Sequence, residues 1–277
     1  MDYKSDSTWR KVQDYLPLEN RLMEGNMPEE YLIEINSASI HIDHYKQENP
    51  KGIVVIFHGV GDNGRLLSFI SAPLWKNGYE VICPDLPLYG YTEFSETISY
   101  NARVEYGIKI VEYFQRADTA MFVFGLSAGG MLAYQIACEC NDITGVIATC
   151  ILDQRNPMVT KRTASNPVIG TLGKRFLGIL HTPFSNLKVP MKIVSNMKSI
   201  VNNEELAKLL MNDTRSAGAR IPIEFIYGML YPQIRTEAEQ FDKCPFLLVH
   251  PEKDMWTDIS LSQLFYINSL VKKRLEF

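Results

Sequence analysis

The most regular feature of the sequence is a series of short apolar runs separated by amphipathic stretches. The runs Ile53–Phe57, Ala120–Phe124 and Phe246–His250 contain little polar alternation. Runs of this kind are typical of strands that are covered on both faces in a parallel sheet. Tyr79–Cys83 and Ile143–Leu152 predict two more strands of the same sheet.

Helical patterns fill the stretches between these runs. The predicted helices are Arg65–Asn77, Ser99–Arg116, Ala128–Cys140 and Ile259–Val271. Before the first of these, the runs Tyr31–Ile35 and Ile40–Tyr45 predict an antiparallel hairpin. The later alternation of strand and helix predicts an α/β fold, with a mostly parallel, doubly wound sheet and right-handed crossovers.

One helix has a pattern clear enough to predict its orientation. In Ser99–Arg116 we expect an apolar stripe to face the core and charged residues to face solvent. The stripe consists of Tyr100, Val104, Ile108, Val111 and Phe114, and the charged face of Arg103, Lys109, Glu112 and Arg116.

The strand–helix rhythm breaks between residues 153 and 242. This stretch shows several helix-like pieces and no clear strand pair, and Asn203 with an acidic first turn predicts the start of a helix over 203–211. We therefore predict a core domain of residues 1–152 and 243–277, with residues 153–242 inserted as a helical cap.

Composition narrows the class of protein. Of 277 residues, 46% are hydrophobic and 22% charged, which excludes disordered and fibrous classes. The net charge of −4 argues against nucleic-acid binding, and no apolar run is long enough for a transmembrane segment. Five cysteines without a CxxC pair, and no visible signal peptide, predict a reduced, cytoplasmic protein. His41 and His44 would face opposite sides of one strand, so we predict no metal, and no cofactor.

A candidate nucleophile lies in the third predicted strand-to-helix connection. Gly125-Leu-Ser127-Ala-Gly129 directly follows Ala120–Phe124 and opens the helix Ala128–Cys140. A serine on such a tight turn needs small neighbours and projects its hydroxyl above the sheet, close to a helix N-terminus. The simpler alternative is that Ser127 is only a helix N-cap.

Further motifs occur in a family order. Ile53–Phe57 leads into His58-Gly-Val-Gly-Asp62, Tyr79–Cys83 leads into Pro84-Asp-Leu-Pro87, and Phe246–His250 leads into Pro251-Glu-Lys-Asp254. Together with the serine turn, they resemble the α/β-hydrolase superfamily, most closely its lysophospholipase and monoacylglycerol-lipase branch, over about Gly52–Leu270. The chain departs from that family at Leu88-Tyr89, where Gly-His is usual.

The resemblance implies roles for particular residues. Ser127 would be the nucleophile, the backbone N–H groups of Val60 and Ala128 would form the oxyanion hole, and Asp254 would be the acid that orients a histidine. Asp258 is a weaker candidate for that acid. In this family the histidine equivalent to His58 supports the oxyanion loop.

The resemblance also places the catalytic histidine on a loop after one further strand. Leu275–Phe277 would be the start of that strand, so we expect the last strand and final helix to be truncated, the base to be missing and the chain to be nearly inactive. An edge strand lost in this way would make a homodimer through the sheet edge a reasonable expectation.

Two functions remain open at this stage. The first is a serine carboxylesterase, or lysophospholipase-like enzyme, that cleaves a small or medium acyl ester; thioester, lactone and acyl-transfer variants would use the same residues. The second is a non-catalytic ligand-binding protein of the same fold. Apolar residues of the insertion would suit an acyl chain, or would only pack against one another: Phe176, Leu177, Leu180, Phe225, Met229 and Leu230.

Overall fold

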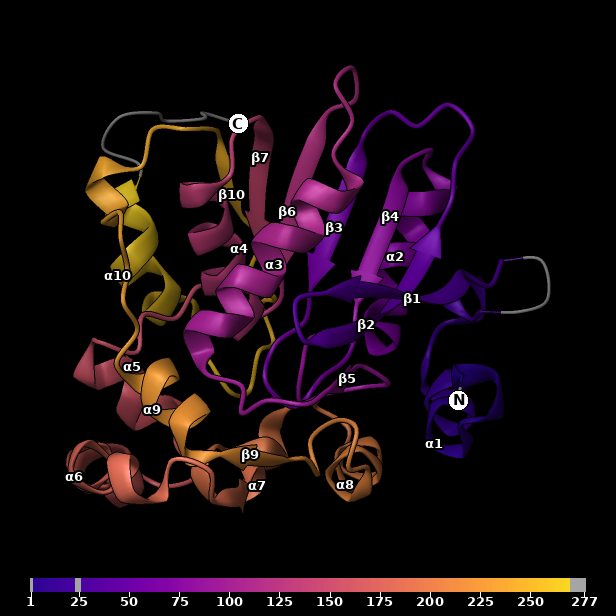
Figure 1. Cartoon of the computed structure of the whole chain (residues 1–277). Helices are drawn as coiled ribbons and strands as arrows, with labels where there is room; N and C mark the ends of the chain where they lie inside the picture. The colour runs from indigo at the N-terminus through magenta and orange to yellow at the C-terminus, as the bar shows by residue number, and fades with distance from the viewer. Residues whose placement is uncertain (1, 23–25, 270–277) are drawn as a thin grey trace.

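One twisted sheet organises the molecule (Figure 1). The computed structural model describes residues 2–22 and 26–269. The sheet has eight strands, seven of them in the order β1-β2-β4-β3-β6-β7-β10, with β5 paired to β2. The strands are β1 (Glu29–Ile35), β2 (Ala38–Tyr45), β3 (Ile53–Phe57), β4 (Glu80–Pro84), β5 (Glu93–Phe94), β6 (Met121–Gly125), β7 (Ile143–Ala148) and β10 (Phe246–Leu248).

The pairing confirms the predicted mixed sheet. β1, β2 and β5 pair antiparallel, whereas β4, β3, β6, β7 and β10 run parallel. Every residue of β3 and β4 is buried, as the continuous apolar runs predicted. β7 is shorter than predicted, because after Ala148 the chain leaves the sheet and Ile151 N–H donates to Ser262 Oγ at 3.1 Å.

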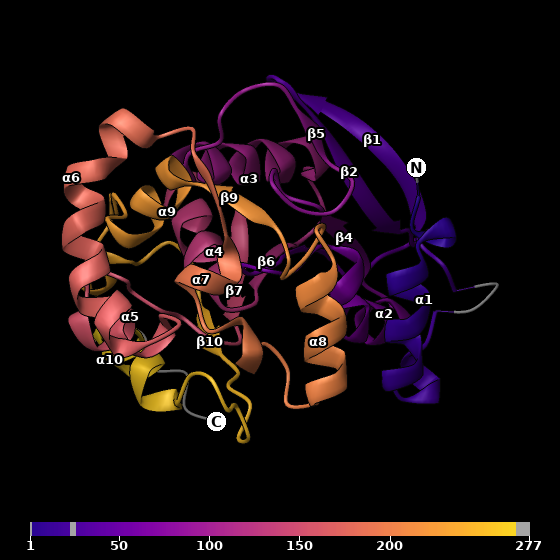
Figure 2. The ribbon, with the colours of Figure 1, turned by 90° about the horizontal axis from the view of Figure 1, so that it is seen from below.

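Helices cover both faces of the sheet (Figures 1 and 2). The core helices are α2 (Ser68–Lys76), α3 (Tyr100–Phe114), α4 (Ala128–Glu139) and α10 (Ile259–Ser269), and a short α1 (Ser7–Val12) lies near the N-terminus. α3 and α4 lie on one face and α2 on the other. Tyr134 of α4 and Phe265 of α10 meet edge to face, with ring centroids 4.9 Å apart. The predicted strand at Leu275–Phe277 lies outside the described residues.

The orientation predicted for α3 is wrong at one position. Arg103, expected on the solvent face, is 1% exposed and belongs to the buried stripe with Tyr100, Gly107 and Ile110. Gly107 allows the close approach to α4, since a Cβ there would lie 2.4 Å from Ile136 Cδ1. This contact rotates α3 so that Arg103 points inward.

Residues 153–230 lie beyond the carboxyl ends of the parallel strands, at the bottom of Figure 1, whereas residues 231–242 run back along α10 toward the start of β10. The helices of residues 153–230 are α5 (Pro157–Thr163), α6 (Lys174–Phe184), α7 (Met191–Val194), α8 (Glu204–Asn212) and α9 (Ile223–Leu230). The Asn203 side chain caps α8 as predicted, accepting from Glu205 and Leu206 N–H. The segment also contains an antiparallel strand pair that the sequence did not predict. It links two parts of the segment that are distant in the chain, β8 (Lys188–Pro190) and β9 (Arg220–Pro222).

A buried charged network fastens the N-terminal segment to the sheet. The Asp85 carboxylate accepts from Tyr3 Oη–H at 2.8 Å and from Gly64 N–H at 2.7 Å, and it lies 3.1 Å from His41 Nδ1. His41 also lies 3.2 Å from Glu30 through Nε2. His44 has other partners, Tyr31 and Glu80, so the two histidines serve separate networks.

No helix within the described ranges is both long and apolar enough to cross a membrane.

Candidate active site

The backbone at Ser127 is strained. β6 ends at Gly125 and α4 begins at Ala128, so the chain reverses within two residues, and Ser127 takes φ 84° and ψ −112°. A non-glycine residue rarely adopts a positive φ of this kind. Backbone hydrogen bonds hold the turn, from Gly129 N–H to Leu126 O at 2.7 Å and from Gly130 N–H to Ser127 O at 2.9 Å.

The glycines of the motif are needed for close packing at the turn. A Cβ on Gly125 would lie 2.0 Å from Gly129 O, and a Cβ on Gly129 would lie 2.2 Å from Phe57 O. Larger residues at either position would therefore force the strand and the helix apart.

The hydroxyl of Ser127 does not cap α4. Ser127 occupies the N-cap position but makes no side-chain capping hydrogen bond, and its side chain lines a pocket instead. The simple N-cap interpretation therefore does not describe this serine.

The loop after β3 lies against the serine turn. A Cβ on Gly59 would be 3.3 Å from Ser127 Cβ and 3.7 Å from Ala128 N, so the backbone of Gly59 passes close to both residues. Val60 and Ala128 line the same pocket as Ser127. The two segments expected to supply oxyanion donors therefore meet at this serine.

Arg103 and His58 fix this loop from behind. Arg103 Nη2–H donates to His58 O at 2.8 Å, and the guanidinium lies over the rings of Tyr89 and Phe225. The His58 ring donates from Nδ1 to Gly59 O at 2.7 Å and accepts from Leu86 N–H at Nε2 at 3.0 Å. Burial, with the nearby Arg103 charge, lowers the pKa of His58 to about 3. His58 is therefore a neutral, doubly bonded support of the loop.

Arg103 was not predicted from the sequence as a residue of the site. A second set of residues also repeats at the helical period, and this set could have shown that Arg103 faces the core: Tyr100, Arg103, Gly107, Ile110 and Phe114. A charged side chain on an otherwise apolar stripe is the kind of exception that marks a buried polar role.

Asp254 lies on the loop after β10, and its neighbours hold it firmly. Its Oδ1 accepts from Trp256 N–H and Thr257 N–H at 2.8 and 2.9 Å, and its Oδ2 accepts from Thr257 Oγ1–H at 2.9 Å. Trp256, two residues on, lines the pocket with Ser127. Asp258 instead lies on the surface, where hydrogen bonds from Ser260 lower the pKa of its carboxyl.

None of the five histidines, all of them among the described residues, is hydrogen bonded to Ser127. His41 and His44 belong to the buried networks of the first strands. His58 is held against the loop that follows β3. His181 of α6 stacks on Tyr227 with ring centroids 3.6 Å apart. His250 donates from Nε2 to Thr257 O at 3.0 Å and lies 3.9 Å from Asp254 Oδ2.

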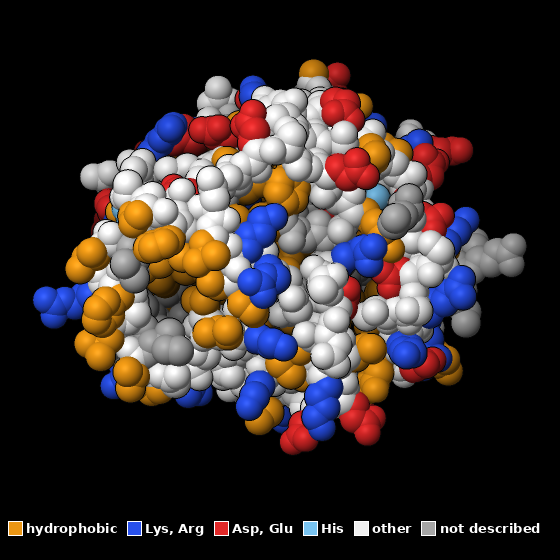
Figure 3. Space-filling model, turned by 60° about the horizontal axis from the view of Figure 1, so that its bottom comes forward, with side chains coloured by type: hydrophobic (Ala, Val, Ile, Leu, Met, Phe, Trp, Pro, Cys, Tyr) orange, Lys and Arg blue, Asp and Glu red, His pale blue; other side chains and the backbone are white. Residues whose placement is uncertain are grey.

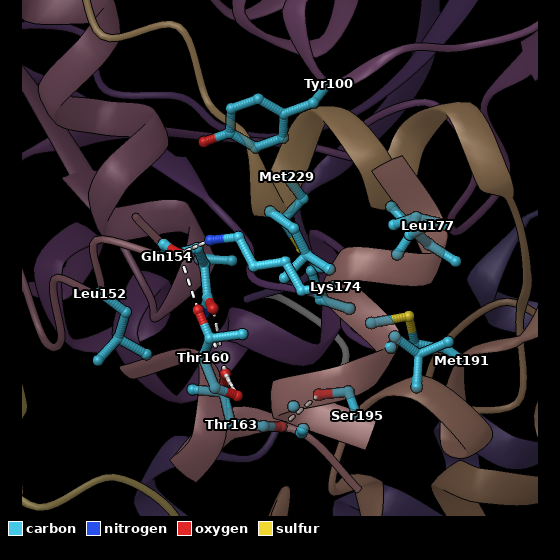
Figure 4. A pocket seen from close by; sticks show the side chains of 18 of the residues that line it. Tyr100, Leu152, Gln154, Thr160, Thr163, Lys174, Leu177, Met191, Ser195 and Met229 are labelled. Atoms are coloured by element: carbon cyan, nitrogen blue, oxygen red, sulfur yellow. Dashed lines mark hydrogen bonds between the residues drawn. The ribbon is translucent and has the colours of Figure 1, made fainter. Parts of the chain in front are cut away.

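A pocket of about 240 Å³ opens beside Ser127. The insertion supplies most of its wall, and apolar side chains from α6, α7 and α9 face the space (Figure 4). Those named in the figure are Leu177, Met191 and Met229. Leu230 also lines the pocket, whereas Phe225 is buried against Arg103 and Phe176 is 61% exposed. The side chain of Leu180 lies outside those described.

A polar strip occupies another side of the pocket. Lys174 Nζ and Thr160 Oγ1–H both donate to Gln154 O, at 2.7 and 2.8 Å, and Ser195 Oγ–H donates to Thr163 O at 3.1 Å (Figure 4). Burial lowers the pKa of Lys174. No acidic residue is among the described side chains that line the pocket.

The face of the molecule formed by the insertion is rich in apolar side chains, which gather around a hollow in Figure 3. On α6 alone, Phe176, Ile179 and Phe184 are 61%, 74% and 49% exposed.

Comparisons with known proteins agree with this geometry. The family model described as "Serine aminopeptidase, S33" matches residues 48–276. No curated protein matches the sequence.

Solved structures of several hydrolases are similar in fold. A monoglyceride lipase from Saccharomyces cerevisiae, bound to a substrate analog, has a TM-score of 0.68 at 16% identity, over 89% of this chain and 84% of that one. A monoacylglycerol lipase from Paleococcus ferrophilus has a TM-score of 0.65 at 19% identity, over 84% and 85%. An N-acyl homoserine lactonase complexed with N-hexanoyl homoserine has a TM-score of 0.61 at 14% identity, over 86% and 83%.

Proposed function

The chain belongs to the serine aminopeptidase S33 family of α/β hydrolases, and from that membership we propose that it is a serine ester hydrolase acting on small or medium acyl esters. The observation that carries the proposal is the strained Ser127, whose hydroxyl faces a pocket instead of capping α4. Strain of this kind, at about 1–3 kcal/mol, persists where the surrounding structure over-determines it, and it clusters at active sites.

In the proposed reaction, Ser127 Oγ attacks the ester carbonyl and forms a tetrahedral intermediate, while its proton passes to a base, added imidazole in the assay below, which then returns the proton to the leaving alkoxide. The N–H groups of Val60 and Ala128 stabilise the negative oxygen. Loss of one such donor lowers kcat by about 10²–10³ in comparable enzymes. The intermediate collapses to an acyl-enzyme and releases the alcohol, and water then hydrolyses the acyl-enzyme. Asp254 is proposed as the acid that orients the base.

The pocket favours an ester over a peptide amino terminus. A free amino group is a cation and would be held by a carboxylate, but the described lining contains no acidic residue and places the cationic Lys174 at the wall. The apolar side chains Leu177, Met229 and Leu230 suit an acyl chain, and residues 153–242 are proposed to act as a cap over it.

The position of the histidines limits the rate expected of these 277 residues. Among the described residues no histidine is hydrogen bonded to Ser127, so no imidazole is in place there to accept the hydroxyl proton, and comparable enzymes lose on the order of 10⁶ in kcat without that histidine. Free imidazole at high concentration is expected to replace part of this missing function.

The test uses p-nitrophenyl butyrate with and without imidazole. We expect imidazole-dependent release of p-nitrophenol and a butyryl adduct on the peptide that contains Ser127, and we expect Ser127→Ala to lose both. Ser195→Ala is the matched control, because Ser195 lines the same pocket. Equal release by Ser127→Ala, after subtraction of the reaction with imidazole alone, would exclude Ser127 as the nucleophile.

Labelling with a fluorophosphonate tests whether a base activates Ser127, separately from whether Ser127 is the nucleophile. Slow labelling without imidazole is expected from a serine that lacks a base. Rapid stoichiometric labelling of Ser127 would mean that His58 or His250 reaches it.

The alternative function is a non-catalytic protein that binds acyl ligands in the same pocket. The same absence of a histidine partner of Ser127, among the described residues, favours it. It predicts binding of a fatty acid without any acyl adduct on Ser127, even with imidazole.

A further inference from the structure

Three potential metal ligands converge beyond the carboxyl ends of two neighbouring strands. Cys150 follows β7, and His250 and Asp254 follow β10, which pairs parallel with β7. One ligand atom from each of the three lies within 4.8 Å of the other two. The convergence comes from strand pairing, since 100 residues separate Cys150 from His250 along the chain.

The two separations from the sulfur are close to the edges of a tetrahedral zinc site, and the third pair, His250 and Asp254, comes within 3.9 Å through Nε2 and Oδ2. Cys150 Sγ lies 3.8 Å from His250 Nδ1 and 3.6 Å from Asp254 Oδ2. With Zn–S of about 2.3 Å and Zn–N or Zn–O of about 2.0–2.1 Å, the edges of a tetrahedron are about 3.3–3.6 Å. Shifts of a few tenths of an ångström would bring Sγ to these distances.

Groups outside the cluster already orient the ligands. His250 Nε2–H donates to Thr257 O, so the ring turns its other nitrogen, Nδ1, toward Cys150 Sγ. Asp254 Oδ1 is held by two backbone N–H groups, while Oδ2 accepts from Thr257 Oγ1–H at 2.9 Å and lies 3.6 Å from the thiol sulfur. A backbone carbonyl on the second ring nitrogen is the usual support of a metal-binding histidine.

We propose that Cys150 Sγ, His250 Nδ1 and Asp254 Oδ2 form a binding site for one Zn²⁺ ion, with water as the fourth ligand. A thiolate, an imidazole and a carboxylate are all ligands that Zn²⁺ accepts. Cys150 and His250 are almost fully buried, whereas the Asp254 side chain is 18% exposed and gives solvent access to the site.

Binding must release a proton. Cysteine binds Zn²⁺ as the thiolate, so the bond from Zn²⁺ to Cys150 Sγ forms as the S–H bond breaks, and one proton leaves per ion.

Zinc binding would also occupy Asp254. This consequence rests on the proposed function, in which Asp254 is the acid of the active site, and it makes Zn²⁺ an inhibitor of ester hydrolysis. The site itself is tested independently of activity, by measurements in a Ser127→Ala background.

The experiment titrates the tag-free chain with Zn²⁺ against a chromophoric chelator, and with Co²⁺ as a spectroscopic probe. We expect one ion per chain, about one proton released, and a thiolate-to-cobalt charge-transfer band. Cys150→Ser should abolish the band, and Cys150→Ser and His250→Gln should each weaken Zn²⁺ binding by at least about 100-fold, the upper end for loss of a supporting residue.

Cys140→Ser is the matched control, since Cys140 is also buried but lies at the end of α4, outside the cluster. Binding that persists in this control and fails in both cluster variants supports the site. No stoichiometric binding by the parent chain, or binding and a charge-transfer band that survive in folded Cys150→Ser, would overturn it. If Cys150→Ser does not fold, His250→Gln decides: undiminished binding by that variant overturns the site as well.

Discussion

Replacing Ser127 by glycine should stabilise the fold relative to replacing it by alanine. Ser127 has φ 84° and ψ −112°, a conformation that costs an L-residue about 1–3 kcal/mol. Alanine keeps the Cβ and therefore the strain, whereas glycine has no Cβ and accepts this backbone readily. Neither variant retains the hydroxyl, so the comparison isolates the backbone.

The expected magnitude includes a cost in the unfolded state. Glycine makes the unfolded chain more flexible than alanine does, by about 0.4–1 kcal/mol. Subtracting this from the strain leaves Ser127→Gly up to about 2.6 kcal/mol more stable than Ser127→Ala, with a central value of about 1.3 kcal/mol. At about 2–4 °C per kcal/mol, the melting temperatures should differ by a few degrees.

Urea unfolding, followed by circular dichroism at constant m-value, measures the difference. Ser195 supplies the control, because it lines the same pocket but has φ −119° and ψ 154°, an ordinary extended conformation. At position 195 the order of stability should reverse, because no strain is relieved: Ser195→Gly should be about 0.4–1 kcal/mol less stable than Ser195→Ala. If Ser127→Gly is no more stable than Ser127→Ala, the turn is not strained and the main support for the proposed nucleophile is lost.

Three further outcomes are expected. Arg103→Met leaves the carbonyl of His58 without its donor, so the free energy of unfolding should fall by about 1–3 kcal/mol in a urea titration. Imidazole-dependent acylation, followed by p-nitrophenol release, should also slow. Partial recovery of that rate in Arg103→Lys would show that Arg103 positions the loop through its hydrogen bond. Burial alone would lower the pKa of His41, but Asp85 and Glu30 raise it to about 10. Its stabilising charge is therefore complete below pH 6.5 and lost as pH rises to 10, and His41→Gln should flatten unfolding free energy over that window. Leu177→Trp should narrow the pocket, reducing Ser127-dependent release from p-nitrophenyl octanoate far more than from the acetate; equal reduction would place the acyl chain elsewhere.

The strands and the serine turn were predictable because their signals are local. Ile53–Phe57 and Ala120–Phe124 are apolar over their whole length, and only a strand buried on both faces accepts such a run. The sequence motif around Ser127 likewise joins a strand to a helix within five residues. In both cases the residues that determine the structure are neighbours in the chain.

The orientation of α3 was not predictable in the same way. Two overlapping stripes fit its helical period, and the choice between them depends on Gly107 meeting Ile136 of another helix. The pair β8 and β9 was missed for a related reason. Each strand has three residues and ends in a proline, so neither contains a period long enough to recognise.

The Leu88-Tyr89 departure shows how such distant contacts also set the chemistry. Leu88 takes φ 87°, a conformation that favours glycine, and the next residue, Tyr89, is buried with its ring edge to face with His58. Arg103 lies over the same ring. The tyrosine therefore packs against both side chains that hold the loop after β3, the proposed oxyanion loop, and the strained leucine positions it there. From sequence, this dipeptide only marked a difference from related enzymes; in the fold, it belongs to the machinery that holds Val60 beside Ser127.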